Sequence, residues 1–207
     1  GRYPRHKRAA RDGLEYAILL MRGSRMSANT YVDQDTCAGC GGRCCKRHAG
    51  ALFPSDIKGP MYRGLVELLS TGMYQIDWYD RNPMMSFEEL RGYTITLQTG
   101  ELKRIENRAR MTKAYYIRPA HVETRGTLFD HSEEEMRTCV FWDGEKGCTS
   151  PSKPAQCRIL KPNPEDTAKC FYPNPIFGYL GSNRALGLMW WPYRGVVRSA
   201  ARAVGNR

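Results

Sequence analysis

The chain has 207 residues, of which 41% are hydrophobic and 26% are charged, and it carries a formal net charge of +11 at pH 7. A chain of this length and composition can bury a core without disulfide staples, so it is predicted to form one compact domain with extended ends. Its most apolar stretches fall far short of the roughly 18 residues that a membrane-spanning helix needs, so we expect no membrane span.

The positive charge gathers at both ends of the chain. Residues 1–11 contain basic residues and no acid, and no acid follows Lys169, although arginines continue to Arg207. Both ends are therefore interpreted as arms for a polyanion or an acidic partner, with nucleic acid among the candidates. The alternative is a basic surface that is merely solvated.

In chain order, the first predicted element is a short helix from about Ala9 to Met21, where apolar residues recur at helical spacing. Residues 1–35 are therefore assigned to a basic arm with one short helix. The apolar stretch 17–21 is too short for a secretory signal peptide.

A cysteine-rich segment follows. The eight cysteines of the chain fall into an early group, Cys37, Cys40, Cys44 and Cys45, and a late group, Cys139, Cys148, Cys157 and Cys170. The early group reads CAGCGGRCC, and its glycines let the backbone curl so that sulfur atoms and N–H groups converge on one point. We call residues 37–45 the knuckle. Residues 36–175 are predicted to form a cysteine-rich metal-binding domain.

Beyond the knuckle, a helix is predicted to begin near Ser55, as its N-cap, and to end near Gly72. Its apolar face consists of Tyr62, Leu65, Val66, Leu68 and Leu69. From Tyr93 apolar and polar residues alternate up to a turn at Gly100, which predicts a β-hairpin. Residues 113–118 are a candidate third strand.

The last part of the chain divides into two stretches. Prolines crowd the sequence after Thr149, which predicts loops anchored by Cys157 and Cys170. Residues 176–207 are predicted to be a C-terminal extension, with an apolar patch around Trp190 and Trp191 that contacts other macromolecules and runs into a basic amphipathic helix.

Three uses of the cysteines compete. A disulfide framework suits smaller secreted chains, and a bridge between the neighbours Cys44 and Cys45 would strain the peptide. Scattered buried thiols would not explain a CxxC, a CC doublet and a Gly-rich spacer together. Metal binding is therefore the favoured interpretation, and it predicts an intracellular, reducing compartment, either the cytoplasm or an organelle matrix.

The cysteine blocks also resemble a known family. CAGCGGRCC followed by FPSDI, and CVFWDGEKGC leading to KPAQCR, resemble the CxxCxxCC family of zinc- or iron-chelating proteins, which includes flagellin lysine N-methylases. The resemblance covers under a quarter of the chain. It departs from the family in two places: the loop between Cys40 and Cys44 is one residue longer, and Lys153 stands where the family usually has Arg. The resemblance implies a zinc ion or an iron–sulfur cluster as the cofactor.

Either cofactor bound by four thiolates is anionic, so it needs positive neighbours and N–H donors. Arg43, Lys46 and Arg158 are the candidate cofactor-binding cations, because each lies next to a cysteine or within a residue or two of one. His48, His121 and His131 are interpreted as solvated. Thiolates suit zinc and iron equally, so ligand identity does not separate these metals.

The sequence therefore predicts an α+β fold: a small irregular single domain with a β-hairpin, short helices and Pro-rich loops organised around cysteine-bound metal. The predicted function is metal binding that ties loops together, with basic ends that contact macromolecular partners in a protein or nucleoprotein assembly. Two alternatives stay open. One is an iron–sulfur-dependent protein-modifying enzyme such as a lysine N-methylase, although no cosubstrate motif is visible. The other is a structural subunit of a large nucleoprotein or virion-like assembly.

Overall fold

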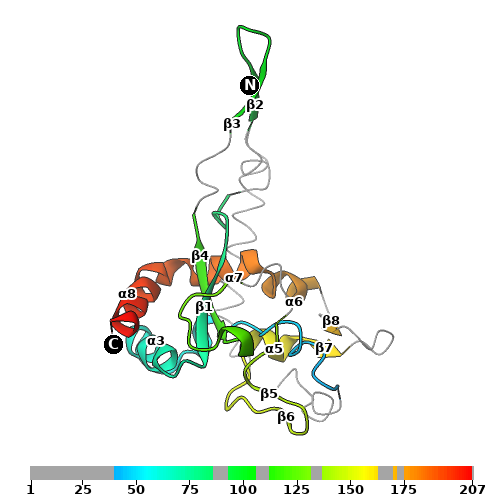
Figure 1. Cartoon of the computed structure of the whole chain (residues 1–207), viewed down its shortest axis with the longest axis vertical. Coiled ribbons are helices and arrows are strands. Elements are labelled where there is room, and N and C mark those ends of the chain that lie inside the picture. Colours follow the sequence, from blue (N-terminus) through cyan, green and yellow to red (C-terminus); the bar gives the residue numbers. More distant parts are fainter. Residues whose placement is uncertain are drawn as a thin grey trace. The chain divides into compact units, whose positions relative to one another are not determined.

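The computed structural model describes residues 40–85, 93–105, 112–131, 137–162, 170–171 and 175–206. The chain divides into two units, Gly1–Tyr31 and Val32–Arg207, and all described residues belong to the second. The helix predicted near Ala9 lies outside the described residues. The second unit combines helices with small antiparallel sheets, so its fold is α+β, as predicted (Figure 1).

A pair of antiparallel strands lies at the centre of this unit. Strand β1 (Tyr74–Tyr79) pairs with β4 (Ala114–Pro119), with Ile76 opposite Ile117. Both isoleucines are fully buried. Segment 128–130 runs beside β1, since Ile76 N–H donates to the carbonyl of Leu128 and its own carbonyl accepts from Asp130 N–H. On the far edge of β4, the carbonyl of Ile117 accepts from Leu52 N–H.

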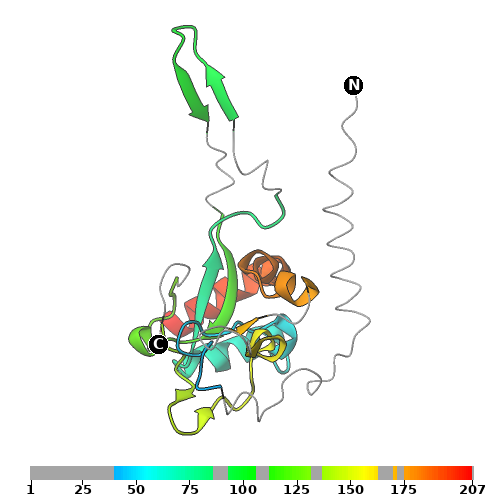
Figure 2. The ribbon, with the colours of Figure 1, turned by 90° about the vertical axis from the view of Figure 1, so that its right-hand side faces the viewer.

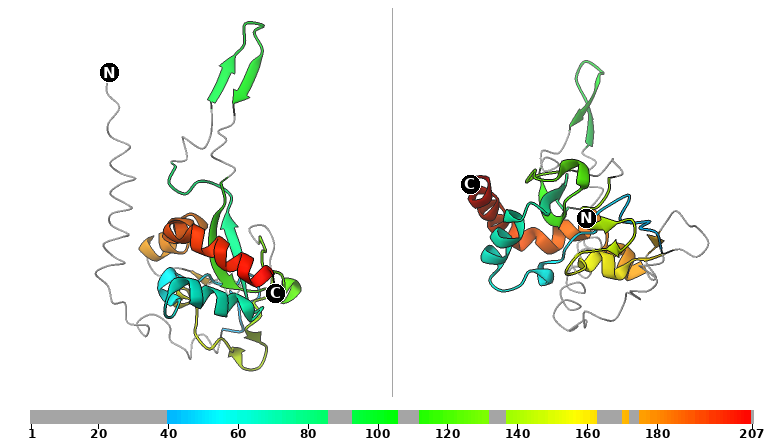
Figure 3. Two further views of the ribbon diagram at one scale, coloured as in Figure 1. Left: turned by 90° about the vertical axis from the view of Figure 1, so that its left-hand side faces the viewer. Right: turned by 60° about the horizontal axis from the view of Figure 1, so that its bottom comes forward.

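Helices cover this strand pair. Helix α7 (Asn183–Trp190) contacts β1 and β4, and α8 (Arg194–Gly205) packs along α3 (Met61–Ser70), as Figures 2 and 3 show. Leu65, Leu186 and Trp190 are fully buried between these elements. The core therefore joins residues from the middle of the chain to residues near its C-terminus.

The predicted β-hairpin is confirmed. Strand β2 (Tyr93–Thr96) pairs with β3 (Leu102–Ile105), and Gly100 has a φ of 79° in the turn. The candidate third strand is also present as β4, but it pairs with β1, which the sequence analysis did not predict.

The helix predicted near Ser55 begins later. Ser55 lies in a short 3-10 helix, η1 (Pro54–Asp56), where the Asp56 carboxylate accepts from Phe53 N–H at 3.0 Å. Helix α3 starts after Pro60, which is its N-cap and offers no side-chain cap. The predicted N-cap was therefore wrong, while the predicted apolar face is correct for the buried Leu65 and Leu69.

The described parts of residues 142–180 form short elements. They are β5 (Trp142–Asp143), β6 (Gly147–Cys148), α5 (Ala155–Ile159), β7 (Lys161–Pro162), β8 (Cys170–Phe171) and α6 (Pro175–Leu180). Two more 3-10 helices, η3 (Val122–Thr124) and η4 (Trp191–Tyr193), connect longer elements.

The C-terminal residues contribute to the core. Trp190 is fully buried and its Nε1–H donates to the carbonyl of Leu52 at 2.9 Å, so the predicted Trp190–Trp191 contact patch is wrong for Trp190. Trp191 stays partly exposed. Among the described residues, no helix combines the length and apolar character required to cross a membrane.

Candidate functional site

The knuckle folds as consecutive turns over its described residues. Lys46 N–H donates to the carbonyl of Gly42, and His48 N–H donates to that of Cys44, both at 2.8 Å. Gly42 has a φ of 73°, and a Cβ built on it would lie 2.4 Å from the ring of Trp142. Only glycine therefore allows the knuckle to lie this close to the β5–β6 hairpin.

Backbone hydrogen bonds join the early and late cysteine groups. The carbonyl of Cys45 accepts from Cys139 N–H at 2.7 Å, and the carbonyl of Arg47 accepts from Arg137 N–H at 3.2 Å. The Sγ atoms of Cys44 and Cys45 lie 3.9 Å apart. Two thiolates bound to one tetrahedral zinc ion at about 2.3 Å lie about 3.8 Å apart, so this separation matches a shared ion.

Cys157 has several other thiols as electrostatic neighbours. Burial raises the pKa of its thiol well above the usual value, and the neighbouring thiols of Cys44, Cys139 and Cys148 raise it further. A backbone hydrogen bond from Gly50 acts in the opposite direction. A Cβ on Gly50 would lie 2.3 Å from the Cys157 sulfur, so the missing side chain lets this N–H approach the sulfur closely.

Cys139 has a similar environment. Burial raises the pKa of its thiol to about 11, while a backbone hydrogen bond from Phe141 and the charge of Arg118 act to lower it. Cys148, on β6, raises the pKa of Cys139 by its proximity. The thiols of Cys139 and Cys157 each have a backbone N–H donor that would stabilise a thiolate.

The structure describes part of the predicted ligand set. Six free cysteines are described: Cys40, Cys44, Cys45, Cys139, Cys148 and Cys157. Cys37 and the side chain of Cys170 lie outside the described residues. Within the described part of the chain, no three His, Cys, Asp or Glu side chains are close enough together to hold a metal ion by themselves.

The predicted cofactor-binding cations have different environments. Lys46 is exposed and lies 5.5 Å from the centre of the Trp142 ring. Arg158 donates to the Asp56 carboxylate at 2.6 Å and to the carbonyl of Lys153, so its charge is paired with an acid. Arg43 is half-buried in the knuckle.

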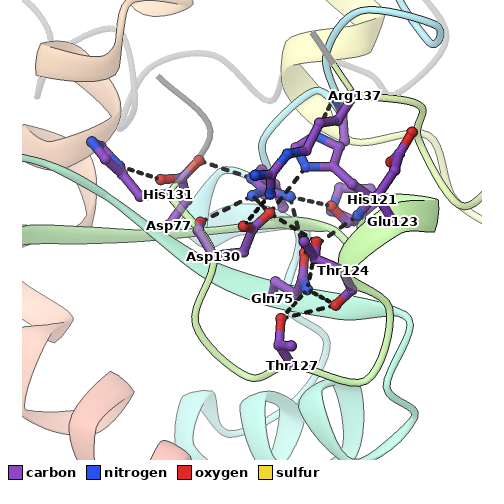
Figure 4. Close-up of polar contacts among 12 residues, drawn as sticks. Gln75, Asp77, His121, Glu123, Thr124, Thr127, Asp130, His131 and Arg137 are labelled. Atoms are coloured by element: carbon purple, nitrogen blue, oxygen red, sulfur yellow. Dashed lines mark hydrogen bonds and ion pairs between the residues drawn. The ribbon is translucent and has the colours of Figure 1, made fainter. Parts of the chain in front are cut away.

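A buried polar cluster, which the sequence analysis missed, supports the cysteine-bearing segments (Figure 4). Its centre is Arg118, which is fully buried. Its guanidinium donates to Asp77 at 2.8 Å, to Asp130 at 2.6 Å and to the side-chain oxygen of Gln75 at 3.2 Å. Arg137 donates to the second oxygen of Asp130 at 2.6 Å. We call these five residues the Arg118 cluster.

The cluster holds the Asp130 carboxylate charged. Burial alone would raise the pKa of Asp130, but hydrogen bonds from Arg118, His121 and Thr124 bring it well below its usual value. The cluster also reaches Thr127, whose hydroxyl accepts from the Gln75 amide at 2.8 Å. A weak signal was present in the sequence, since Gln75 and Asp77 alternate with the apolar Ile76 in one strand.

The histidines correct the interpretation that they are solvated. His121 is fully buried, its Nε2 accepts from Ala49 N–H at 3.4 Å, and its Nδ1 lies 3.1 Å from Asp130. These contacts assign the proton to Nδ1 of a neutral ring, and burial lowers its pKa. Burial also lowers the pKa of His48 to about 4. His131 lies between the carboxylates of Asp77 and Asp80, 3.1 Å from each.

His121 links the cluster to both cysteine groups. Ala49 follows the knuckle by a few residues, and His121 forms an isolated antiparallel bridge with Cys139. The Arg118 cluster therefore fixes the positions of the backbone segments that carry the thiols.

Comparison with known proteins finds no match to a family model, to a curated protein or to a solved structure. The resemblance to the CxxCxxCC family thus depends on the cysteine blocks and their neighbours alone.

Proposed function

We propose that this protein binds a metal through cysteine thiolates that join the knuckle to the late cysteine group. The observation that supports this most directly is the environment of Cys157, a half-buried residue with Cys44, Cys139 and Cys148 as electrostatic neighbours. Gathering several thiols without a cation gains little, whereas thiolates around a metal are stabilised by its charge.

The donor chemistry fits zinc or an iron–sulfur cluster. Both bind thiolates, and both anionic complexes are stabilised by N–H donors such as those of Gly50 and Phe141. The described thiols lie near one another, but no three of them are close enough together to bind one ion. Metal binding is therefore expected to contract the loops that carry them, so that binding and loop ordering are coupled. A reducing compartment follows from this proposal, since the thiols must stay unoxidised.

Anaerobic purification followed by metal analysis tests the proposal. Zinc or iron is expected in stoichiometric amount, and visible sulfur-to-iron absorbance separates an iron–sulfur cluster from colourless zinc. Replacing Cys157→Ser should abolish or strongly reduce metal content, because the serine hydroxyl is a poor ligand for either metal. Arg63→Gln is a useful comparison, since Arg63 lies exposed on α3 and its loss should leave metal content unchanged.

Two results would contradict metal binding. One is a native chain without bound metal after anaerobic purification and reconstitution. The other is loss of free thiols in the native protein, detected by alkylation under denaturing conditions, which would indicate disulfides. A coloured protein would favour the alternative of an iron–sulfur-dependent modifying enzyme over a structural zinc protein.

The second part of the proposal concerns partners. The basic C-terminal end is proposed to contact a macromolecular partner, because α8 exposes Arg194, Arg198 and Arg202 and no acid lies after Lys169. A nucleoprotein assembly is one setting in which such an end would act.

A further inference from the structure

A row of aromatic rings lies on one face of the β1–β4 pair. Trp78 and Tyr115 are opposite each other in the register, so their side chains share this face. The ring of Phe129 meets that of Tyr115 edge to face, with centroids 6.1 Å apart. Phe129 keeps 46% of its surface exposed, so one face of its ring is open to a ligand.

Cations lie against these rings. The guanidinium of Arg198 is 5.8 Å from the centre of the Tyr115 ring, and Lys113 Nζ is 3.8 Å from that of Trp78. Arg194 lies 4.8 Å from the ring of Trp191. Lys113, just before β4, and Arg198 on α8 therefore lie against the two neighbouring rings of Trp78 and Tyr115.

Helix α8 presents its arginines as a stripe. Arg194, Arg198 and Arg202 recur every fourth residue and are exposed, while the opposite side of the helix is buried in the core through Val197 and Ala200. Four residues of helix rise about 6 Å, so the stripe is an evenly spaced line of positive charge.

The carboxylates described near this face have partners of their own. Asp80 lies at the far end of the ring row, where it accepts from Trp78 Nε1 at 2.7 Å and lies 3.1 Å from His131. Glu67 on α3 is paired with Arg63 at 2.8 Å. Neither carboxylate is recorded in contact with the arginine stripe among the described residues.

We propose that this face binds single-stranded nucleic acid, with phosphates along Arg194, Arg198 and Arg202 and bases stacking on Phe129 and Tyr115. Evenly spaced cations complement a repeating anion, and aromatic rings beside them supply stacking platforms that any base can use. A merely solvated basic helix would need no exposed ring at its side. This inference goes beyond metal binding, does not depend on it, and names the partner of the basic C-terminal end.

The same face does not suit an anionic membrane. An interfacial helix inserts an apolar side between lipid headgroups, but the apolar side of α8 is buried in the protein core. Its exposed positions are arginine, glycine and serine, as at Arg198, Gly195 and Ser199.

Fluorescence anisotropy with labelled oligo-dT and oligo-U on the full chain tests the proposal across a salt series. We expect binding that weakens with salt, and each of R194Q, R198Q and R202Q should reduce the log–log salt slope by about 0.7. F129A should weaken binding by about tenfold or more without changing the salt slope, because stacking releases no counterions. Every variant keeps the N-terminal arm, so differences in affinity between variants come from this face.

K146Q is the matched control. It removes the same charge from an exposed position in the turn between β5 and β6, and should leave affinity and slope unchanged. Circular dichroism and thermal melting of each variant exclude loss of folding as the cause.

The inference is overturned if the native chain fails to bind either oligonucleotide at low salt. It is equally overturned if the triple variant R194Q/R198Q/R202Q binds as tightly as the native chain, or if phosphatidylserine vesicles bind through these arginines while oligonucleotides do not. Metal content is measured on the same samples, so failure of nucleic-acid binding with metal retained leaves the metal proposal standing, and the converse also holds.

Discussion

At the scale of single residues, the Arg118 cluster shows how charges are held in the interior. Asp77, Asp130 and Arg118 are almost completely buried, and every described contact of the guanidinium goes to an oxygen. Removing one partner from such a buried group of charges destabilises the fold by more than the whole group stabilises it, because the remaining charge is buried without a partner.

Asp130→Asn should therefore lower the free energy of unfolding by about 3–5 kcal/mol at pH 7. The pKa of Asp130 is depressed in the folded state, so its contribution is present above the unfolded pKa of about 3.9 and is lost as pH falls toward the folded value. The difference between native and variant proteins should shrink below about pH 4. Urea unfolding at several pH values measures it.

The control for this experiment is Glu67→Gln, which breaks an exposed pair with Arg63 on α3. It should cost less than about 0.5 kcal/mol. A gap between native protein and Asp130→Asn that stays constant down to the lowest pH would show that the carboxylate charge is not what stabilises the fold.

Gly50 is a second residue whose side chain, if it had one, would disturb the site. Gly50→Ala would place a Cβ 2.3 Å from the Cys157 sulfur, so the thiol must move and metal affinity is expected to fall by tenfold or more, as for loss of a supporting contact. Competition with a metal-sensitive chromophoric chelator measures the affinity.

Gly144→Ala provides the comparison, since its Cβ would enter open space in the β5–β6 turn. Equal metal affinities for the two variants would mean that the position of Cys157 is irrelevant to binding.

At the scale of elements, α7 lies very close to the strand pair. A Cβ on Gly187 would lie 2.9 Å from the Cβ of Ala114 and 3.5 Å from that of Tyr79. Glycine at this helix position lets α7 lie directly on β1 and β4, at the expense of helix propensity.

Gly187→Ala should thus destabilise the protein by about 1–3 kcal/mol, although alanine is the better helix former. Gly195→Ala on α8, where a Cβ would meet nothing, should instead stabilise by up to about 1 kcal/mol. Thermal or urea unfolding of both variants distinguishes packing from propensity.

The cause can be isolated with a double-mutant cycle. Ala114→Gly removes the group that the new methyl would meet, so the pair with Gly187→Ala should show a favourable coupling energy. Additive effects of the two substitutions would refute contact between α7 and β4 as the reason.

At the scale of the whole molecule, the metal is proposed to connect segments far apart in the chain. The knuckle and residues 137–157 meet through backbone hydrogen bonds and clustered thiols, while the remaining core packs around β1 and β4. A ligand that binds only the folded state raises the stability of that state, in proportion to the logarithm of the free ligand concentration divided by Kd.

Removing the metal with a chelator should therefore lower the melting temperature. The free energy of unfolding should fall by about 4 kcal/mol if the metal was present at a thousandfold above its Kd. Calorimetry with and without chelator gives the difference. In Cys157→Ser the chelator should have no effect, and a chelator-insensitive native protein would remove the proposed structural role of the metal.

Some features of the fold were accessible from sequence because they depend on neighbours along the chain. The hairpin was predicted from alternation and a glycine turn, and α8 from apolar spacing. Strand β1 was missed because Gln75 and Asp77 interrupt its apolar character, and they are buried only because Arg118 lies opposite. Trp190 was assigned to the surface because local sequence does not show that Leu52 accepts its N–H.

The sequence by itself determined the chemical inventory: eight cysteines in two groups, glycines that permit tight turns, and basic ends. Composition and the spacing of nearby residues are enough to identify these features, because none of them depends on residues far away in the chain. Only the tertiary structure decided that Cys157 lies among early and late thiols, that His121 is a neutral buried link, and that Tyr115 contacts both Phe129 and Arg198 of α8. Each of these depends on burial and on contacts between segments far apart in the chain, which set the energy of a charge, a thiol or a ring.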